Sequence, residues 1–398
     1  MRKMIATAIV FAPVLLLAGC WDRTELNDLA LVTAVAIDKP EGQGVELSVQ
    51  IMIPRKIGGG TMGGGTSSSE GKQTLVRSET GTNIADALSK LQRIVPRKLF
   101  WGQCKVFIFG ESMAKEGIQE SMDFLVRHPQ PRERAYMYVS KGKAAAALEV
   151  SPPLERSSGE VLRELSDLQI GIQVTMKELN KMLTGESQAA TLPYVHILPP
   201  EKGSKETQTI PYIYGSAIFK KDKMIQRITE KTTRGVMWLR NEIKEYTVTF
   251  QHENEKGEKG AISLKPIKAK VKLIPRIDKE KWKMVVKVWT EGDMVQNGTK
   301  MNPLHPELIS KLEQSFQKDV KERIELALRV VQQELKVDIF NFGREFHRKY
   351  PAQWRKTKER WEELFPQVEV TTIIDAHIRR PGLIGPPGGL PKEEVEKQ

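Results

Sequence analysis

Hydrophobic and polar positions predict an N-terminal part in which strands and helices take turns. Short apolar runs separated by turn residues predict strands at 29–37, 45–53, 74–79, 105–109 and 135–139. Apolar residues at three- to four-residue spacing predict helices at 83–95 and 113–127, the first with Thr82 as its N-cap. This order predicts an α+β or α/β layer for this part of the chain.

A helical stretch and a Pro-rich linker follow. Helices are expected at 144–149, 159–167 and 175–183, and a linker at 199–209. Residues 213–219 and 223–228 then read as a hairpin around Lys-Lys-Asp, with a short helix expected over 236–241.

The C-terminal part has longer strands with a different pattern. Strands are expected at 245–251, 262–273 and 282–290, and apolar residues alternate with polar ones along them. This alternation indicates an antiparallel sheet with one buried and one solvated face. From Pro303, apolar residues recur every three to four positions to about residue 335, which predicts a long helix packed across that sheet. Two helices (338–351 and 351–365) and a strand (367–378) complete the pattern.

These elements predict an α+β protein of several domains, with a C-terminal antiparallel sheet packed by a long helix. The expected division is a removed segment, an N-terminal α+β domain with a Gly-rich loop at 58–71, a mostly helical middle domain with a linker, a C-terminal α+β domain and a flexible tail. Their ranges are 1–19, 21–139, 140–208, 209–380 and 381–398.

The first residues have the pattern of a lipoprotein signal peptide. Arg2 and Lys3 precede an apolar run from Ile5 to Ala18, whose length of about 14 residues is too short for a span that needs about 20. The run ends in Leu-Ala-Gly-Cys, which resembles the bacterial lipobox. We therefore expect cleavage before Cys20, a diacylglyceryl group on its thiol and a mature protein that is anchored to a membrane without spanning it.

Composition adds a positive charge and a lack of disulfides. The net charge is +12, and loss of residues 1–19 would lower it to about +10. We interpret the charge as a solvated surface beside anionic lipid headgroups, since a nucleic-acid role does not fit an exported lipoprotein. The second of the two cysteines, Cys104, lies in a strand-like run and is expected to be a small buried hydrophobic residue.

No catalytic, metal or cofactor site can be assembled from the sequence. GGGTSSSEGKQT imitates a phosphate-binding loop, but its spacing is wrong and Gln73 follows Lys72 where Ser or Thr should bind magnesium. The six histidines show no metal-ligand spacing, and no GxSxG motif is present. This predicts a binding or assembly protein rather than an enzyme.

Several blocks of the chain, in order, resemble one known family. They are GCWDRTELNDL, LFWGQCKVFIFGESMAKEGIQESMDFLVRH, GSAIFKKDKMI, DIFNFGREFHRKYPAQW and VTTIIDAHIRRPGLIG, and together they extend over roughly 21–385. The chain thus resembles the Ger(x)C lipoproteins, the C subunits of nutrient germinant receptors in spore-forming bacteria. The Gly-rich insert at 58–71 is longer than that pattern leads one to expect.

The resemblance implies a non-catalytic subunit of three α+β domains on the outer face of the spore's inner membrane. Its implied partners are two integral-membrane subunits, one transporter-like and nutrient-sensing and one with soluble domains. The family supplies no ligand site to carry over. Residues 340, 342, 354 and 361 are expected to be core aromatics, and Gly215 and Gly343 to lie where backbones turn or approach closely.

The residues just after Cys20 are the candidate contact site. Trp21, Asp22, Arg23 and Glu25 would lie next to the lipid. Trp21 could sit in the headgroup layer, where indole is favoured, or dock on the folded domain. Two other functions stay open at this point: a substrate-binding lipoprotein of a nutrient transporter, which needs two similar lobes around a cleft, and a cell-wall enzyme, which needs paired carboxylates or a metal site.

Overall fold

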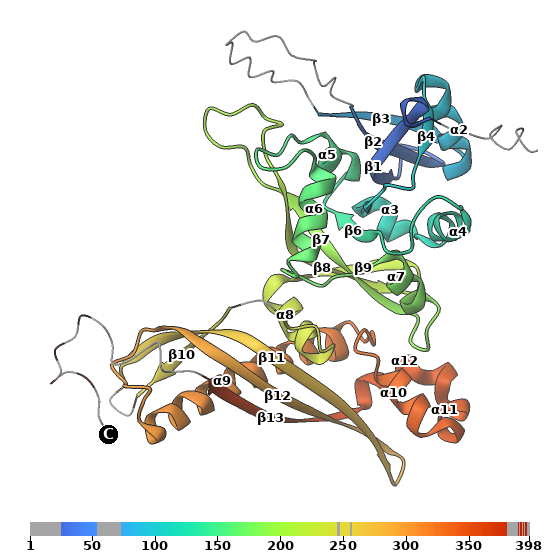
Figure 1. The fold of residues 1–398 in the computed structure, drawn as a ribbon. Helices are drawn as coiled ribbons and strands as arrows, with labels where there is room; N and C mark the ends of the chain where they lie inside the picture. The colour runs from blue at the N-terminus through green and yellow to red at the C-terminus, as the bar shows by residue number, and fades with distance from the viewer. Residues whose placement is uncertain are drawn as a thin grey trace, which may run out of the picture.

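The computed structural model describes residues 25–53, 73–244, 247–254 and 257–379, with a few single positions of the tail. The fold consists of two units, one above the other in Figure 1. The first unit holds β1 to β9 and the second β10 to β13, and helix α8 (Glu230–Leu239) lies where they meet. The predicted mixed α+β class is confirmed.

The first unit is built on a nine-stranded mixed sheet. Its strands are β1 (Leu29–Asp38), β2 (Val45–Met52), β3 (Thr74–Gly81), β4 (Lys98–Phe100), β5 (Val106–Gly110), β6 (Tyr136–Ser140), β7 (Ala189–Ile197), β8 (Pro211–Lys220) and β9 (Lys223–Thr229). Their order is β3-β2-β1-β5-β6-β7-β8-β9, with β4 paired to β1. The four neighbouring strands β1, β5, β6 and β7 run parallel to one another. Antiparallel strands flank them on both sides, β2 beside β1 and β8 beside β7.

Helices cover both faces of this sheet, which explains why its central strands are apolar throughout. The helices are α2 (Ile84–Ile94), α3 (Glu111–Glu116), α4 (Gln119–Arg127), α5 (Ala144–Glu149), α6 (Ser158–Asp167) and α7 (Met176–Leu183). Helices α5 and α6 pack on one face, against Ala36, Ile108 and Tyr138, and the others lie on the opposite face. Strand β5 is therefore buried at every position.

Three local expectations for the first unit were wrong. The N-cap of α2 is Asn83 and not Thr82, since the Asn83 side chain accepts the Asp86 N–H at 3.0 Å. No strand was expected at 189–197, yet β7 is a central strand. Proline has no N–H to donate to a neighbouring strand. Pro193 is tolerated because β7 pairs with β6 only at Tyr194 and Val195, so that Pro193 lies outside this ladder. The single helix expected over 113–127 is two helices, since Gly117 between them has φ +139°, which a right-handed helix cannot include.

The second unit has a four-stranded sheet in the order β10-β11-β12-β13. Its strands are β10 (Val248–Glu253), β11 (Lys259–Asp278), β12 (Lys281–Asn297) and β13 (Glu369–Arg379). The first three are antiparallel as predicted, whereas β13 pairs parallel to β12. Along β12, buried Met284, Val286 and Val288 alternate with residues that face solvent, so one face of this sheet is covered and the other is open.

Helix α9 (Pro306–Ala327) covers the inner face, as the apolar stripe predicted. Phe316 from this helix stacks on Phe250 of β10, with ring centroids 5.7 Å apart. The continuous helix expected to about residue 335 is instead π-helical over Leu328–Glu334. The π-helical segment holds buried Gln332, whose side-chain amide donates to the carbonyls of Phe365 and Val368.

Three short helices close the second unit: α10 (Phe342–Lys349), α11 (Pro351–Thr357) and α12 (Trp361–Leu364). The helix expected over 351–365 is thus interrupted, by a 3₁₀ turn at Lys358–Arg360. One cluster of buried side chains continues from the first sheet through α8 to these helices. The hydrogen-bonded first sheet also runs past residue 208, because β8 pairs with β7 and β9 pairs with β8. The division into three domains stays a prediction.

Candidate functional site

The residues expected to contact membrane or partner lie around the start of the described chain. Four predicted residues lie outside the described part: Cys20, Trp21, Asp22 and Arg23. Glu25 is exposed, and its carbonyl accepts a hydrogen bond from the Asp28 N–H at 3.0 Å. This bond closes a 3₁₀ turn, Leu26–Asp28, that leads directly into β1.

An open, largely apolar groove adjoins this turn. Its volume is about 430 Å³. We call it the anchor-side groove, and it is lined by Leu26, Leu31, Thr33, Met52, Phe100, Gln103, Lys105, Gly159, Glu160 and Arg163. These residues come from the turn, the neighbouring strands β1, β2 and β4, the loop before β5, and the first turns of α6. The groove therefore lies at the edge where the chain enters the fold.

The groove combines exposed apolar side chains with a polar rim. Leu26 is 70% exposed and Ile53, beside the groove residue Met52, is 42% exposed. Lys105 reaches the rim without an acidic partner among the residues that the structure describes. Apolar clefts with a few polar groups at the edge suit an apolar side chain or chain segment of a partner.

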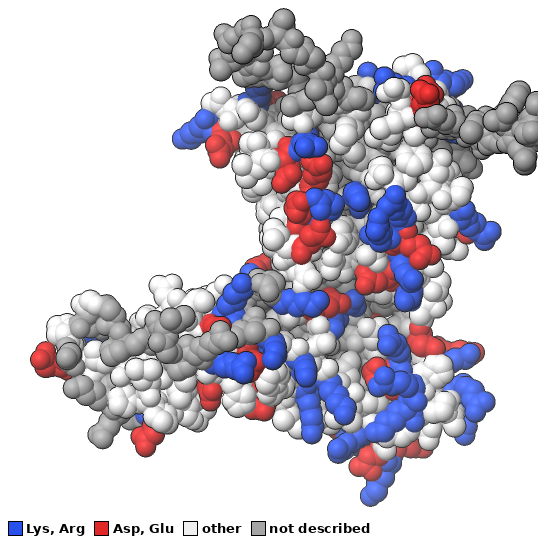
Figure 2. Space-filling view, viewed as in Figure 1, with Lys and Arg blue, Asp and Glu red and all other residues white. Residues whose placement is uncertain are grey.

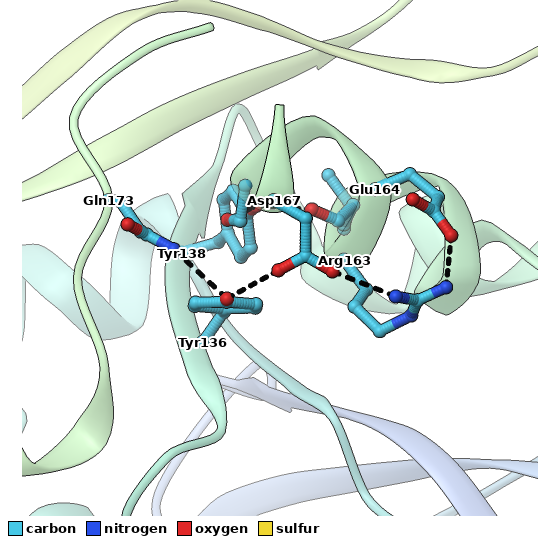
Figure 3. A network of polar contacts seen from close by, with 8 residues as sticks. Tyr136, Tyr138, Arg163, Glu164, Asp167 and Gln173 are labelled. Atoms are coloured by element: carbon cyan, nitrogen blue, oxygen red, sulfur yellow. Dashed lines mark hydrogen bonds and ion pairs between the residues drawn. The ribbon is translucent and has the colours of Figure 1, made fainter. Parts of the chain in front are cut away.

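A polar network holds the α6 side of the groove in place. In Figure 3, Asp167 lies between Tyr136 and Arg163 and binds both. The Tyr136 hydroxyl donates to Asp167 Oδ1 at 2.6 Å and accepts from Gln173 Nε2 at 2.9 Å. Arg163 donates to Asp167 Oδ2 at 2.8 Å and also pairs with Glu164. The Arg163 side chain is thereby fixed at the groove rim with its charge already balanced.

The tyrosines of this network stay neutral at physiological pH. Burial, followed by the hydrogen bond to Asp167, raises the pKa of Tyr136. Burial also raises the pKa of Tyr138, whose hydroxyl donates to the Leu162 carbonyl at 2.6 Å. A neutral phenol that donates to a carboxylate orients that carboxylate, but it is neither a nucleophile nor a base. The network is a structural support for α6.

Polar contacts also fix the start of α6. The Ser157 hydroxyl accepts the Glu160 N–H at 3.2 Å and caps the helix. Gln50, fully buried in β2, donates to Ser158 Oγ and to the Leu148 carbonyl. Gly159 lies so close to the sheet that a Cβ there would come 2.8 Å from Ala34 Cβ. These contacts hold the start of α6 closely against the sheet beside the groove.

Sequence reasoning did not find this groove. Leu31 and Met52 belong to strands whose patterns predict core residues, and nothing in a pattern marks which strand end is uncovered. Glu160 and Arg163 come from a helix more than 100 positions further on, and only the β1–α6 packing brings them alongside. The one signal in the sequence was an apolar residue, Leu26, among charged and polar residues shortly before a strand.

The aromatic block near the C-terminus is a core and not a ligand cage, as expected. Asp338 is buried at its centre and accepts from the Phe340, Phe342 and Gly343 N–H groups, the Ser187 hydroxyl and Trp361 Nε1. Burial raises the pKa of Asp338, although these donors act in the opposite direction. Since Ser187 belongs to the first unit, this carboxyl also ties the two units together.

Three further expectations are confirmed. A Cβ at Gly215 would come 2.1 Å from the Ile228 carbonyl oxygen, and one at Gly343 would come 2.8 Å from the Trp354 ring, so both glycines mark close approaches. Cys104 is buried, and burial raises its pKa to about 12. Such a thiol behaves as a small hydrophobic group.

Neither a metal centre nor a membrane span is found in the described parts. Within these ranges, no three His, Cys, Asp or Glu side chains are grouped so that they could hold a metal ion. No helix in the same ranges is both long and apolar enough to cross a bilayer.

Comparison with known proteins shows which family this chain belongs to. Residues 22–197 match the model "Spore germination protein N-terminal domain" and residues 214–382 match "Spore germination B3/ GerAC like, C-terminal". The chain belongs to the Ger(x)C family. The linker expected from Pro and Gly at 199–209 falls in the gap between the two matched ranges.

Curated relatives of this Ger(x)C protein match along nearly their whole length. Spore germination protein KC of Bacillus subtilis (strain 168) is 28% identical over 401 residues, covering 96% of this chain and 97% of the relative. Spore germination protein B3 of the same organism is 22% identical, covering 97% of this chain and 100% of the relative. The crystal structure of the GerBC protein aligns with a TM-score of 0.55 at 18% identity, over 87% of this chain and 96% of that one. That likeness shows the shared fold.

Proposed function

We propose that this chain is the lipid-anchored, non-catalytic subunit of a spore nutrient germinant receptor. It would be held on the outer face of the spore inner membrane by a diacylglyceryl group on Cys20. There it would support receptor assembly and nutrient-triggered germination together with two integral-membrane subunits, one of them transporter-like and nutrient-sensing. The full-length match to spore germination proteins carries this proposal.

The short connection between Cys20 and the fold supports a membrane-proximal first unit. The five residues that follow Cys20, up to Glu25, reach at most about 18 Å when fully extended. Leu26, at the end of this tether, lines the anchor-side groove. We therefore propose that the groove faces the integral-membrane subunits, and that residues 21–25 form part of the same contact.

Substitution of Cys20 tests the anchor. We expect Cys20→Ala to release the protein from the spore membrane fraction and to abolish germination with nutrient, while germination with dodecylamine continues. Cys104→Ala is the matched control, because Cys104 is buried and far along the chain from the anchor. Full membrane residence and full nutrient response of the Cys20→Ala strain would overturn the proposal.

A negative charge introduced into the anchor-side groove tests the proposed contact with the integral-membrane subunits. We expect Leu26→Asp to lower co-purification of the membrane subunits without unfolding the protein, because Leu26 is already 70% exposed. Leu154→Asp is the control, since Leu154 is 93% exposed and lies outside the groove lining. Equal loss of co-purification in both variants would remove the groove from the proposal.

The two alternative functions receive no comparable support. A transporter's substrate-binding lipoprotein needs two similar lobes, whereas one unit here has nine strands and the other has four, in unrelated orders. Titration with amino acids, sugars and nucleosides would reveal strong binding by this subunit alone. Incubation with peptidoglycan, followed by product analysis, would reveal a cell-wall enzyme.

A further inference from the structure

The open face of the second sheet carries a positively charged surface that the proposed anchor does not use. Alternation along β11 and β12 turns four exposed basic side chains outward. We call this surface the basic sheet face, defined by Lys270, Lys272, Arg276 and Lys287 together with Trp289 and Ile373. Figure 2 shows many blue side chains over the lower unit, with red ones among them.

These charges lack acidic partners. None of the four basic side chains of the face forms an ion pair within the ranges that the structure describes. Three acidic residues of the same sheet face pair with basic side chains: Glu291 with Lys268 and Arg379, and Glu369 and Asp278 with Lys283. Asp375, beside Trp289, contacts only His377 among these partners. In the described part of this sheet, four unpaired basic side chains against the single carboxylate of Asp375 leave the centre of the face with an excess of positive charge.

Like charges are also placed directly opposite one another. Lys272 of β11 is the register partner of Lys287 of β12, and Arg276 is the partner of Lys283. Directly opposed like charges destabilise a sheet by roughly 0.2–1 kcal/mol per pair. An anion bound over the face would relieve this repulsion.

Protection of an edge strand does not account for the arrangement. Beyond residue 264, β12 is the one described strand that pairs with β11, and lysines on such an edge hinder aggregation. Lys287, however, lies on β12, which is paired on both sides, to β11 and to β13. A central strand has no edge to protect, so Lys287 needs another explanation.

The face also offers apolar contact area. Ile373 of β13, opposite Lys287, is 49% exposed, and Trp289 lies two residues along β12 from Lys287 on the same face. A partly buried tryptophan and a half-exposed isoleucine among basic side chains form a mixed surface suited to a protein contact, where aromatic residues are enriched and charges steer the partner.

We propose that the basic sheet face docks an acidic surface segment of a partner protein. The position of the face favours a protein over a lipid surface, because it lies on the lower unit while the chain enters the fold at the far end of the upper unit in Figure 1. This choice rests on the proposed anchor at Cys20, whereas the charge pattern itself does not. Docking would neutralise Lys272 and Lys287 together.

The test combines binding with stability. We would measure a fluorescein-labelled oligoglutamate peptide by anisotropy, using the full chain in a non-ionic detergent. We expect Lys272→Thr/Lys287→Thr to weaken binding about fivefold, through loss of two ionic contacts. In the free protein, the same double variant should raise the thermal midpoint by about 1–3 °C, because it removes an opposed like-charge pair.

The matched control is Lys318→Gln/Lys202→Gln, which removes the same charge from exposed positions outside the face. We expect this control to change binding less than twofold and to leave the thermal midpoint unchanged. Equal weakening in both double variants would mean that only net charge is sensed, and would overturn the proposal. A second arm uses phosphatidylglycerol vesicles. Binding of the vesicles that depends on Lys272 and Lys287, without peptide binding, would make the partner a membrane and also overturn it.

Discussion

The two sheets of this protein differ in how many of their faces are covered. The first sheet is sandwiched between helices, so β5 is buried at every one of its positions. The second is covered by α9 on one face only, and β12 alternates buried and outward-facing residues. On the first unit, the anchor-side groove opens at the ends of covered strands, whereas the second unit leaves a whole sheet face open. Interaction surfaces of very different chemistry follow from this difference: one apolar, one basic.

The largest effects should come from truncating neighbouring residues of β5. Phe107 and Ile108 point to opposite faces of the first sheet, and both are fully buried. We expect Phe107→Ala to lower the free energy of unfolding by about 3–5 kcal/mol and Ile108→Ala by about 2–5 kcal/mol. Urea unfolding would measure both. A near-neutral result for either variant would mean that this face is not covered.

The next effect concerns the junction between the two units. Asp338→Ala would leave buried donors from both units without an acceptor, Ser187 among them. We expect a loss of about 3 kcal/mol, since a buried unsatisfied donor costs roughly 1–3 kcal/mol and some would find water. Because the carboxyl joins the units, thermal unfolding should also separate into two transitions. A single unshifted transition would contradict this role.

A pair of adjacent substitutions in β12 sharpens the comparison further. Val286 is buried on the covered face, and Lys287 is exposed on the open one. We expect Val286→Ala to cost about 2 kcal/mol, from two lost methyl groups. Lys287→Thr alone should leave the free energy of unfolding unchanged or slightly higher. Similar destabilisation by both substitutions, measured by chemical unfolding, would show that the outer face is also packed.

The smallest effect is a pH dependence at α2. The Thr82 N–H, then Lys90 and the Thr82 hydroxyl, lower the pKa of Asp86 to about 2 from its ordinary value of 3.8. The folded pKa lies below the unfolded one, so this stabilisation is present above about pH 4 and is lost as pH falls through about 2. Asp86→Asn should flatten the acid limb of the stability profile. An unchanged slope between these pH values would refute the assignment.

The pattern of apolar and polar residues along the chain predicted most helices and strands, but not which strands pair with one another. The alternation in β12 correctly indicated a sheet with one covered face, and the stripe of α9 indicated what covers it. Strand β7 was missed because Pro193 argues against a central strand, and only the short β6 ladder makes it acceptable. The parallel pairing of β13 depends on how residues some 80 positions apart meet, which no local pattern encodes.

The same limit applies to the candidate sites. Leu-Ala-Gly-Cys is a contiguous signal, so Cys20 could be singled out from the sequence. The groove needs β1, β4 and α6 side by side, and the opposed Lys272 and Lys287 need the register of β11 on β12. Charges on a strand are visible in a sequence, but their cross-strand partners are not.

The most direct test of the central proposal is the mass of the N-terminal peptide of the native protein, purified from dormant spore membranes. We predict that the mature chain begins at Cys20 and that its first peptide carries a diacylglyceryl group on the cysteine thiol. A native chain that begins at another residue, or an unmodified Cys20 in the membrane-bound protein, would contradict the proposal that this subunit is lipid-anchored through that residue.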